Sequence, residues 1–176
     1  SEVANSIANP IIKAVSLTGS EQAGIAVATE AGKHLKKCVL ELGGSNAFII
    51  LEDANLDKAV AIAVNARMQN AGQSCIAAKR FLVHENIVEE FVAKLKVAIQ
   101  NLKTGNPFDK EMQIGSLARV DLAEELEAQV QKSIQMGADL IVGGTRKEAF
   151  YEPTILANVT TEMPVFNEET FGPVAS

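Results

Sequence analysis

Cys75 lies in a run of small and uncharged residues, Gly72-Gln73-Ser74-Cys75-Ile76-Ala77-Ala78. The run follows a predicted helix, and a loop at the end of a helix is open to a substrate in a way that a strand is not. A thiolate is a strong nucleophile, and small neighbours leave room for a reacting carbonyl group. The same pattern also fits a free cysteine that packs in the interior as a small apolar residue. Cys75 is therefore a candidate nucleophile with a structural alternative.

Glu41 is the second candidate, because it stands between two leucines in Leu40-Glu41-Leu42 and is followed by Gly43-Gly44. A carboxylate at the end of an apolar strand loses hydration, which is unfavourable unless the group is paired or functional. Such a group can serve as a general base near neutral pH. The two glycines let a ligand or another backbone come close. The alternative is a glutamate at a sheet edge whose side chain points into water.

Two further segments are weaker candidates for ligand binding. Thr18-Gly19-Ser20 precedes a predicted helix, where backbone N–H groups and the helix dipole favour a phosphate. Most Gly-Ser turns before helices bind nothing, so this signal is weak by itself. Residues 168–173, with the sequence EETFGP, form an acidic turn that indicates no particular ligand when taken alone.

The elements that would position these motifs alternate between short strands and helices. Ser20 is a plausible N-cap, and Asn86 and Glu89 have the spacing of a capping box. Apolar residues from Ile87 to Leu102 repeat at helical spacing and are expected to face the core. Strands are predicted at about 13–20, 38–42, 47–51, 80–84, 138–142 and 154–156, and helices at about 21–37, 56–68, 86–102 and 118–136. The strands at 38–42 and 47–51 are expected to be buried, and the alternation predicts an α/β fold with a largely parallel sheet.

The composition excludes several classes of function. Of 176 residues, 47% are hydrophobic and 22% are charged, which is typical of a globular chain. The net charge of −6, with no dense run of Lys and Arg, argues against a nucleic-acid partner. The apolar stretches are shorter than a membrane span, and the N-terminus lacks a signal pattern. We expect a cytoplasmic protein with neither a membrane nor a nucleic acid as partner.

The cysteines and histidines do not form a metal-binding pattern. Cys38 and Cys75 lack the spacing of a disulfide framework or a zinc site, and His34 and His84 are isolated from both. Cys38 lies within an apolar strand and is expected to be a packing residue. We therefore expect no bound metal and a reducing compartment.

Taken together and in this order, the four segments resemble the aldehyde dehydrogenase superfamily over essentially the whole chain. The family's glutamate motif reads LELGG at 40–44, its cysteine motif reads GQSC at 72–75, and its late E-x-F-G-P element reads ETFGP at 169–173. Glu41 and Cys75 are 34 residues apart (75 − 41 = 34), which matches the usual spacing in the family. The sequences at 42–45 and 72–80 look like those of bacterial succinate-semialdehyde dehydrogenases.

The resemblance implies oxidation of an aldehyde to a carboxylic acid with NAD or NADP as cofactor. The thiolate of Cys75 would attack the aldehyde carbon to give a thiohemiacetal, and hydride transfer to the nicotinamide ring would leave a thioester on Cys75. Glu41 would then activate the water that releases the acid. The backbone N–H of Cys75 would supply half of an oxyanion hole.

The resemblance also implies a set of cofactor-binding residues. Gly19 and Ser20 would lie near the pyrophosphate, and Leu42 near the nicotinamide amide. Glu169 would hold the nicotinamide ribose, with Phe171 against the side of the ring. A homodimer or homotetramer is the expected assembly of the parent enzyme.

The chain departs from the family pattern in length and at one motif position. Family members are well over twice as long, so we expect 1–42 to be the C-terminal part of a dinucleotide-binding domain and 43–176 an incomplete catalytic domain. The asparagine that completes the oxyanion hole would lie upstream, and the isolated chain is expected to be inactive or nearly so. Ser45 stands where many relatives have a lysine after the two glycines.

Two other functions remain open from the sequence. One is a CoA-acylating or reductive semialdehyde enzyme of the same fold, although the presence of Glu41 favours hydrolysis of the thioester. The other is a non-enzymatic structural or binding module, for which Cys75 would react no faster than a model thiol.

Overall fold

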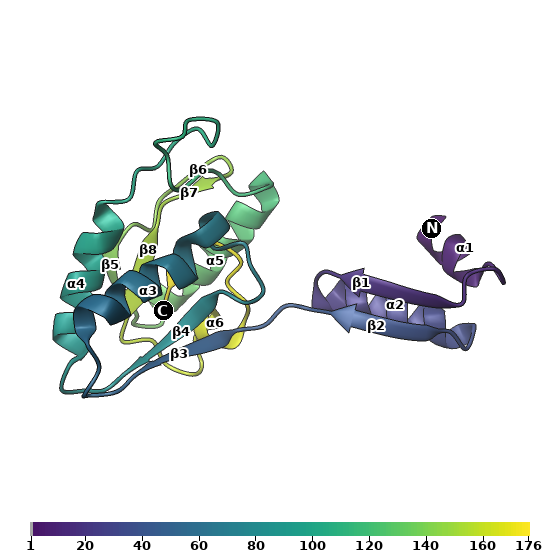
Figure 1. Cartoon of the computed structure of the whole chain (residues 1–176), viewed down its shortest axis with the longest axis horizontal. Helices are drawn as coiled ribbons and strands as arrows, with labels where there is room; N and C mark the ends of the chain where they lie inside the picture. Colours follow the sequence, from purple (N-terminus) through teal and green to yellow (C-terminus); the bar gives the residue numbers. More distant parts are fainter. Residues whose placement is uncertain (1) are drawn as a thin grey trace. The chain divides into compact units, whose positions relative to one another are not determined.

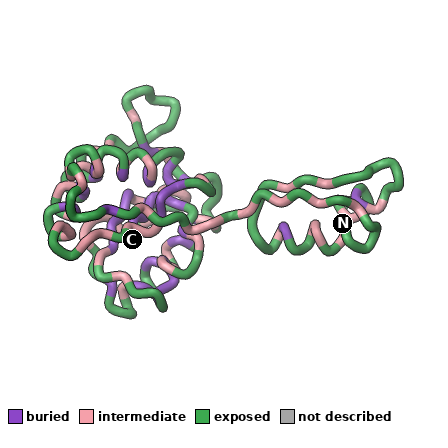
Figure 2. Tube along the Cα trace, turned by 60° about the horizontal axis from the view of Figure 1, so that its bottom comes forward, coloured by how far each residue is buried: buried purple, intermediate pink, exposed green. Residues whose placement is uncertain are grey.

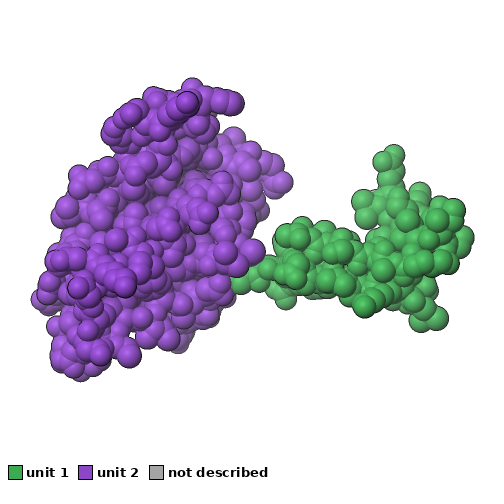
Figure 3. Space-filling view, viewed as in Figure 1, with its two compact units in different colours: residues 1–44 green, residues 45–176 purple. Residues whose placement is uncertain are grey.

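The computed structural model describes residues 2–176, which form two compact units. The first unit ends at Gly44 and the second begins at Ser45 (Figure 3). Both units contain helices and strands (Figure 1), and the larger parallel pairs give an α/β fold, as the alternation in the sequence predicts. Buried residues are concentrated in the second unit, whereas the first buries few side chains (Figure 2).

The first unit is a strand–helix–strand element preceded by a short helix. It consists of α1 (Glu2–Ala8), β1 (Ala14–Thr18), α2 (Glu21–Lys33) and β2 (Lys37–Glu41). β1 and β2 are parallel neighbours, with α2 as the connection packed against both. Ser20 caps α2 as predicted, because its hydroxyl oxygen accepts a hydrogen bond from Ala23 N at 3.3 Å.

Two predictions for this unit are wrong in detail. The helix ends at Lys33 instead of continuing to residue 37, because Leu35 adopts a left-handed backbone (φ 53°) that a helix cannot contain. β2 is not buried on both faces: its residues alternate between exposed and half-buried, since only β1 pairs with it and α2 covers one face. Cys38 accordingly lies half-buried in β2.

The second unit contains the remaining elements. They are β3 (Asn46–Ile50), α3 (Leu56–Met68), η1 (Gln69–Gly72), β4 (Ala78–Val83), α4 (Val88–Gln100), α5 (Val120–Gln135), β5 (Asp139–Val142), β6 (Arg146–Lys147), β7 (Phe150–Tyr151), β8 (Thr154–Ala157), α6 (Pro164–Asn167) and β9 (Val174–Ala175). The predicted helices and strands of this unit are all present, with ends that differ by a few residues. The short elements η1, α6, β6, β7 and β9 were not predicted, because so few residues carry little periodicity and these segments lack apolar runs like those of β5 and β8.

The strands of the second unit are joined by backbone hydrogen bonds. β3 pairs with β4 and β8 with β9 in parallel, and β5 pairs with β8 antiparallel. Ser176 links the two sets, since Phe81 N donates to Ser176 O at 2.7 Å and Ser176 N donates to Lys79 O at 3.4 Å, the pattern of a parallel pair. This link brings β4, which follows Cys75, beside the strand that follows the ETFGP segment. The sheet therefore positions two of the predicted motifs together.

The core of the second unit lies between this sheet and its helices. α3 and α4 pack on each other and on the strands, and Phe91, Leu95 and Ile99 on α4 are at most 3% exposed, which confirms the predicted core stripe. The predicted capping box is wrong, because α4 begins after Ile87 without a side-chain cap. Asn86 instead donates to Glu52 at 2.7 Å. β3 is also less buried than predicted: Ile50 is buried but Ile49 is 64% exposed.

Candidate active site

The loop that carries Cys75 begins with three residues in a left-handed backbone conformation. Asn70, Ala71 and Gly72 have φ angles of 53°, 52° and 74°. Such a conformation costs a residue with a side chain about 1–2 kcal/mol, so the surrounding contacts must hold the loop in place. Cys75 itself is exposed, and the reading of it as a buried packing residue is therefore wrong.

Polar side chains within the loop fix its path. Asn70 Nδ2 donates to Gln73 O at 3.0 Å, and Gln73 Nε2 donates back to Asn70 O at 3.1 Å. Gln73 Oε1 also accepts a hydrogen bond from Ala118 N at 2.8 Å, which ties the loop to the residues before α5. A turn closed by Ala77 N and Ser74 O at 3.2 Å then presents Cys75 at its tip.

Arg67 at the end of α3 fastens this loop to the ETFGP segment. Its side chain is 1% exposed, and its guanidinium group donates to backbone carbonyls on both sides, those of Gly72, Ala78, Thr170 and Gly172. Burial lowers the pKa of Arg67 to about 10, with the negative charge of Glu169 acting in the opposite direction. The group is thus still charged at neutral pH, and its charge strengthens each of these hydrogen bonds.

Glycines let the two segments touch. At Gly72, with its positive φ, a Cβ atom would collide with the carbonyl group of Gly172 and with the Arg67 side chain. At Gly172 a Cβ atom would collide with a methyl group of Leu126 on α5. Gly72 of the GQSC motif is therefore required by close packing against backbone as well as by its positive φ, whereas a side chain at Gly172 would require Leu126 to move.

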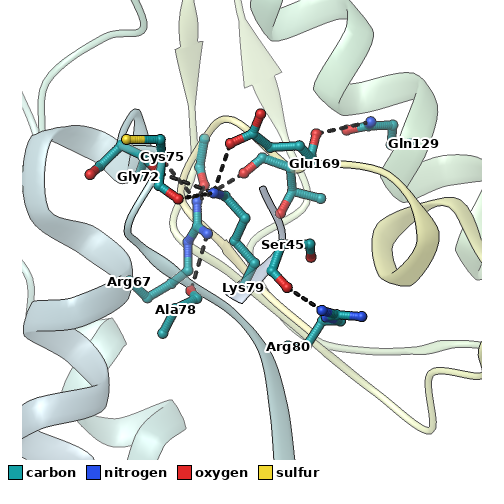
Figure 4. Close-up of polar contacts among 12 residues, drawn as sticks. Ser45, Arg67, Gly72, Cys75, Ala78, Lys79, Arg80, Gln129 and Glu169 are labelled. Carbon is teal, nitrogen blue, oxygen red and sulfur yellow. Dashed lines mark hydrogen bonds and ion pairs between the residues drawn. The ribbon is translucent and has the colours of Figure 1, made fainter. Parts of the chain in front are cut away.

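Lys79 makes a second connection between the same two segments (Figure 4). Its side chain is fully buried, and Nζ donates to Ser74 O at 3.1 Å and to Cys75 O at 3.2 Å. The same ammonium forms an ion pair with Glu169 Oε1 at 2.8 Å. The carboxylate of Glu169 is thereby held near the backbone of the candidate nucleophile.

The rest of the ETFGP segment divides into buried and accessible parts. Thr170 is buried, whereas Phe171 is 38% exposed and Glu169 retains 26% of its side-chain exposure. An accessible carboxylate beside an accessible aromatic ring suits a ligand that has hydroxyl groups and a planar ring. These residues fit the ribose and ring contacts that the family resemblance implies.

The first unit places its own predicted residues at one edge of a parallel strand pair. Thr18 and Glu41 are register partners, so Gly19, Ser20 and Leu42 all follow the carboxyl ends of β1 and β2. This edge is where open α/β sheets bind ligands, and it adjoins the N-terminus of α2. The amide of Gly19 is already used, since it donates to Glu41 O at 3.0 Å. Gly19 would therefore serve a pyrophosphate by allowing close approach, and not through its N–H group.

Glu41 and Leu42 differ in how they are held. Glu41 is exposed at the end of β2, which agrees with the alternative of a side chain that points into water and not with a desolvated carboxylate. Those leucines project to the opposite face, as neighbours along a strand do. Leu42 packs against α2, where a Cβ atom at Gly24 would lie 2.7 Å from a Leu42 methyl group.

The structure thus brings the predicted residues together in two sets. Cys75, Glu169 and Phe171 lie in the second unit on segments joined by Arg67 and Lys79, while Gly19, Ser20, Glu41 and Leu42 share one edge of the first unit. Sequence reasoning missed the two buried cations. A basic residue inside an apolar stretch was the available signal, because a buried charge has to be paired.

The side chains and helices of residues 2–176 bear on metal ligation and on membrane crossing. No cluster of three or more His, Cys, Asp or Glu side chains is arranged to hold a metal ion in this part of the chain. Among the helices described there, none combines the length and the apolar character that a membrane crossing requires.

The fold and this arrangement agree with the comparison to known protein families. The family described as "Aldehyde dehydrogenase family" matches residues 1–176, and the chain belongs to this family. Among curated relatives, the succinate semialdehyde dehydrogenase [NAD(P)+] Sad of Escherichia coli (strain K12) is 50% identical over 177 residues, covering 99% of this chain and 38% of the relative. The succinate-semialdehyde dehydrogenase [NADP(+)] of Deinococcus radiodurans is 48% identical, covering 96% of this chain and 36% of the relative.

Solved structures show the same similarity. The succinic semialdehyde dehydrogenase from Streptococcus pyogenes, solved in complex with NADP+, superposes with a TM-score of 0.94 at 38% identity, covering 99% of this chain and 39% of that chain. The succinate-semialdehyde dehydrogenase from Burkholderia pseudomallei gives a TM-score of 0.95 at 36% identity, covering 98% and 36%. The chain therefore spans less than two fifths of the length of these relatives.

Proposed function

We propose that this chain forms part of an NAD- or NADP-dependent enzyme that oxidises an aldehyde to a carboxylic acid, with succinic semialdehyde as the favoured substrate. The observation that carries the proposal is the exposed Cys75 on a strained turn, which Arg67 and Lys79 fasten to the segment of Glu169 and Phe171. The names of the relatives support both the substrate and the cofactor. Residues 1–42 would belong to the dinucleotide-binding domain and 43–176 to the catalytic domain.

Cys75 acts as the nucleophile in the proposed reaction. Its thiolate adds to the aldehyde carbon to form a thiohemiacetal, and the Cys75 N–H stabilises the negative oxygen that develops. A bound nicotinamide cofactor would supply the hydride acceptor, and loss of hydride from the thiohemiacetal carbon would leave a thioester on Cys75. Because the loop is held at both ends by buried side chains, the nucleophile is positioned before the substrate binds.

Glu41 acts as the general base that releases the product. It takes a proton from water, the resulting hydroxide attacks the thioester carbon, and the thiolate of Cys75 leaves as the carboxylic acid forms. Glu169 and Phe171 bind the nicotinamide ribose and the side of the ring, while Gly19, Ser20 and Leu42 line the path of the pyrophosphate and the nicotinamide amide. The enzyme is expected to be cytoplasmic and to work as a homodimer or homotetramer.

The proposal is tested by turnover in the full-length enzyme, meaning a protein of the relatives' length that contains this chain. We expect reduction of NAD or NADP with succinic semialdehyde, faster than with a panel of short uncharged aldehydes, with free succinate as the product. Addition of coenzyme A should change neither the rate nor the product, because water is the acyl acceptor. A succinyl-CoA product would instead establish the CoA-acylating alternative, and no turnover with any aldehyde would favour the non-enzymatic one.

A further inference from the structure

Lys79 is a fully buried lysine whose side chain connects two proposed functional groups. Nζ reaches the carbonyl oxygens of Ser74 and Cys75 at 3.1 and 3.2 Å and the carboxylate of Glu169 at 2.8 Å, with Glu169 lying 90 residues further along the chain. Lysine is almost never fully buried without partners, because the loss of hydration around the ammonium must be offset. One cation therefore contacts both the backbone at Cys75 and the carboxylate of Glu169.

These contacts differ from those of the neighbouring cation Arg67. The Arg67 guanidinium binds backbone carbonyls in both segments, which is sufficient to hold the two segments together. Lys79 reaches past the backbone to a side chain, and that carboxylate is partly accessible at 26% exposure (Figure 4). A purely structural cross-link does not require that its acidic partner be accessible. A lysine that orients a ligand-binding carboxylate does require it, because the ligand must reach that carboxylate.

We propose that Lys79 is a positioning residue that couples the cofactor-binding carboxylate of Glu169 to the loop of Cys75. The ammonium fixes the orientation of the Glu169 carboxylate, so less side-chain freedom is lost when ribose hydroxyls donate hydrogen bonds to it. The same ammonium holds the carbonyls of Ser74 and Cys75. Binding at the ribose site therefore changes the environment of the nucleophile. In the same way, the geometry of the nucleophile loop changes the affinity of the ribose site.

This inference rests on the proposed function for the role of Glu169, and its test has one arm that needs no turnover. In the full-length enzyme, the alkylation rate of Cys75 by iodoacetamide is measured with and without NADP+ for wild type, Lys79→Met, Glu169→Gln and the double variant. Lys103→Met is the matched control, because Lys103 forms an exposed ion pair with Glu111 at 2.6 Å. The second arm compares the KM for the nucleotide with kcat.

We expect Glu169→Gln alone to change the alkylation rate of Cys75 severalfold and to remove the effect of NADP+ on it, although Glu169 does not contact the thiol. We expect Lys79→Met to raise the KM for the nucleotide about tenfold, with a smaller change in kcat, and the double variant to be little worse than either single one. Lys103→Met should behave as wild type in both arms.

Two results would overturn the coupling. One is an alkylation rate in Glu169→Gln that equals the wild-type rate with and without NADP+, and this variant remains informative even if Lys79→Met does not fold. The other is a double variant whose effect on KM is the product of the two single effects. An enzyme without turnover in which Glu169→Gln still alters Cys75 reactivity would contradict the proposed function while supporting the coupling.

Discussion

Glu41→Gln in the full-length enzyme is expected to stop the reaction at the thioester. Hydride transfer precedes the step that Glu41 serves, so the first turnover should still produce about one equivalent of reduced nucleotide per site. The following steady state should fall by about 10²–10⁴, the usual contribution of a general base. Rapid mixing with absorbance detection of reduced nicotinamide resolves the burst from the steady state.

Glu30→Gln is the control for this variant. Glu30 is a carboxylate on α2 in the same unit, paired with Lys33 at 2.9 Å, and its replacement should leave both phases unchanged. If Glu41→Gln removes the burst along with the steady state, Glu41 acts before hydride transfer, and its assignment as the base for hydrolysis is wrong. An unchanged steady state would also exclude that assignment.

Arg67→Met is expected to have the largest effect on stability of any single change near the site. Methionine fills much of the volume but leaves several buried carbonyl groups without a donor, among them those of Gly72 and Thr170. Each buried polar group without a partner costs roughly 1–3 kcal/mol, and we expect the free energy of unfolding to fall by about 3–5 kcal/mol in total. Denaturant titration of the full-length enzyme measures this change.

A loss of activity should accompany the loss of stability, because the left-handed residues Asn70 and Ala71 would no longer be held in place. Arg119→Met is the matched control, since Arg119 is exposed and pairs only locally with Asp121 at 2.8 Å. That variant should show little change in either property. Equal stability of the two variants would mean that Arg67 does not hold the loop.

The sequence predicted the elements well where their physical signal is local. The helix stripe through Phe91, Leu95 and Ile99 and the cap at Ser20 both depend on neighbours a few residues away, and both are confirmed. The predicted capping box at Asn86 is wrong because the Asn86 side chain donates a hydrogen bond to Glu52, 34 residues earlier in the chain. Propensity is a weak guide wherever such a distant partner competes.

The candidate site shows the same division between local and distant effects. Cys75 and Glu41 were found from motifs, whereas Arg67 and Lys79 owe their roles to Thr170 and Glu169, which lie about a hundred residues away. A buried cation can be suspected from an apolar neighbourhood, but its partners depend on the pairing of β4 with the chain around Ser176. Glu41 is exposed, as the sheet-edge alternative had it, and the sequence did not decide between the two readings because the number of strands beside β2 is not encoded in β2 itself.

The most direct test of the central claim is the turnover of the Cys75→Ala variant of the full-length enzyme with succinic semialdehyde and NAD+ or NADP+. Cys38→Ala serves as the control, because Cys38 is the other free cysteine of the chain and lies half-buried in β2. We predict that Cys75→Ala lowers turnover by about a thousandfold or more, as loss of a covalent nucleophile does, while Cys38→Ala retains the wild-type rate. Turnover that persists in Cys75→Ala would show that Cys75 is not the nucleophile and would contradict the mechanism proposed here.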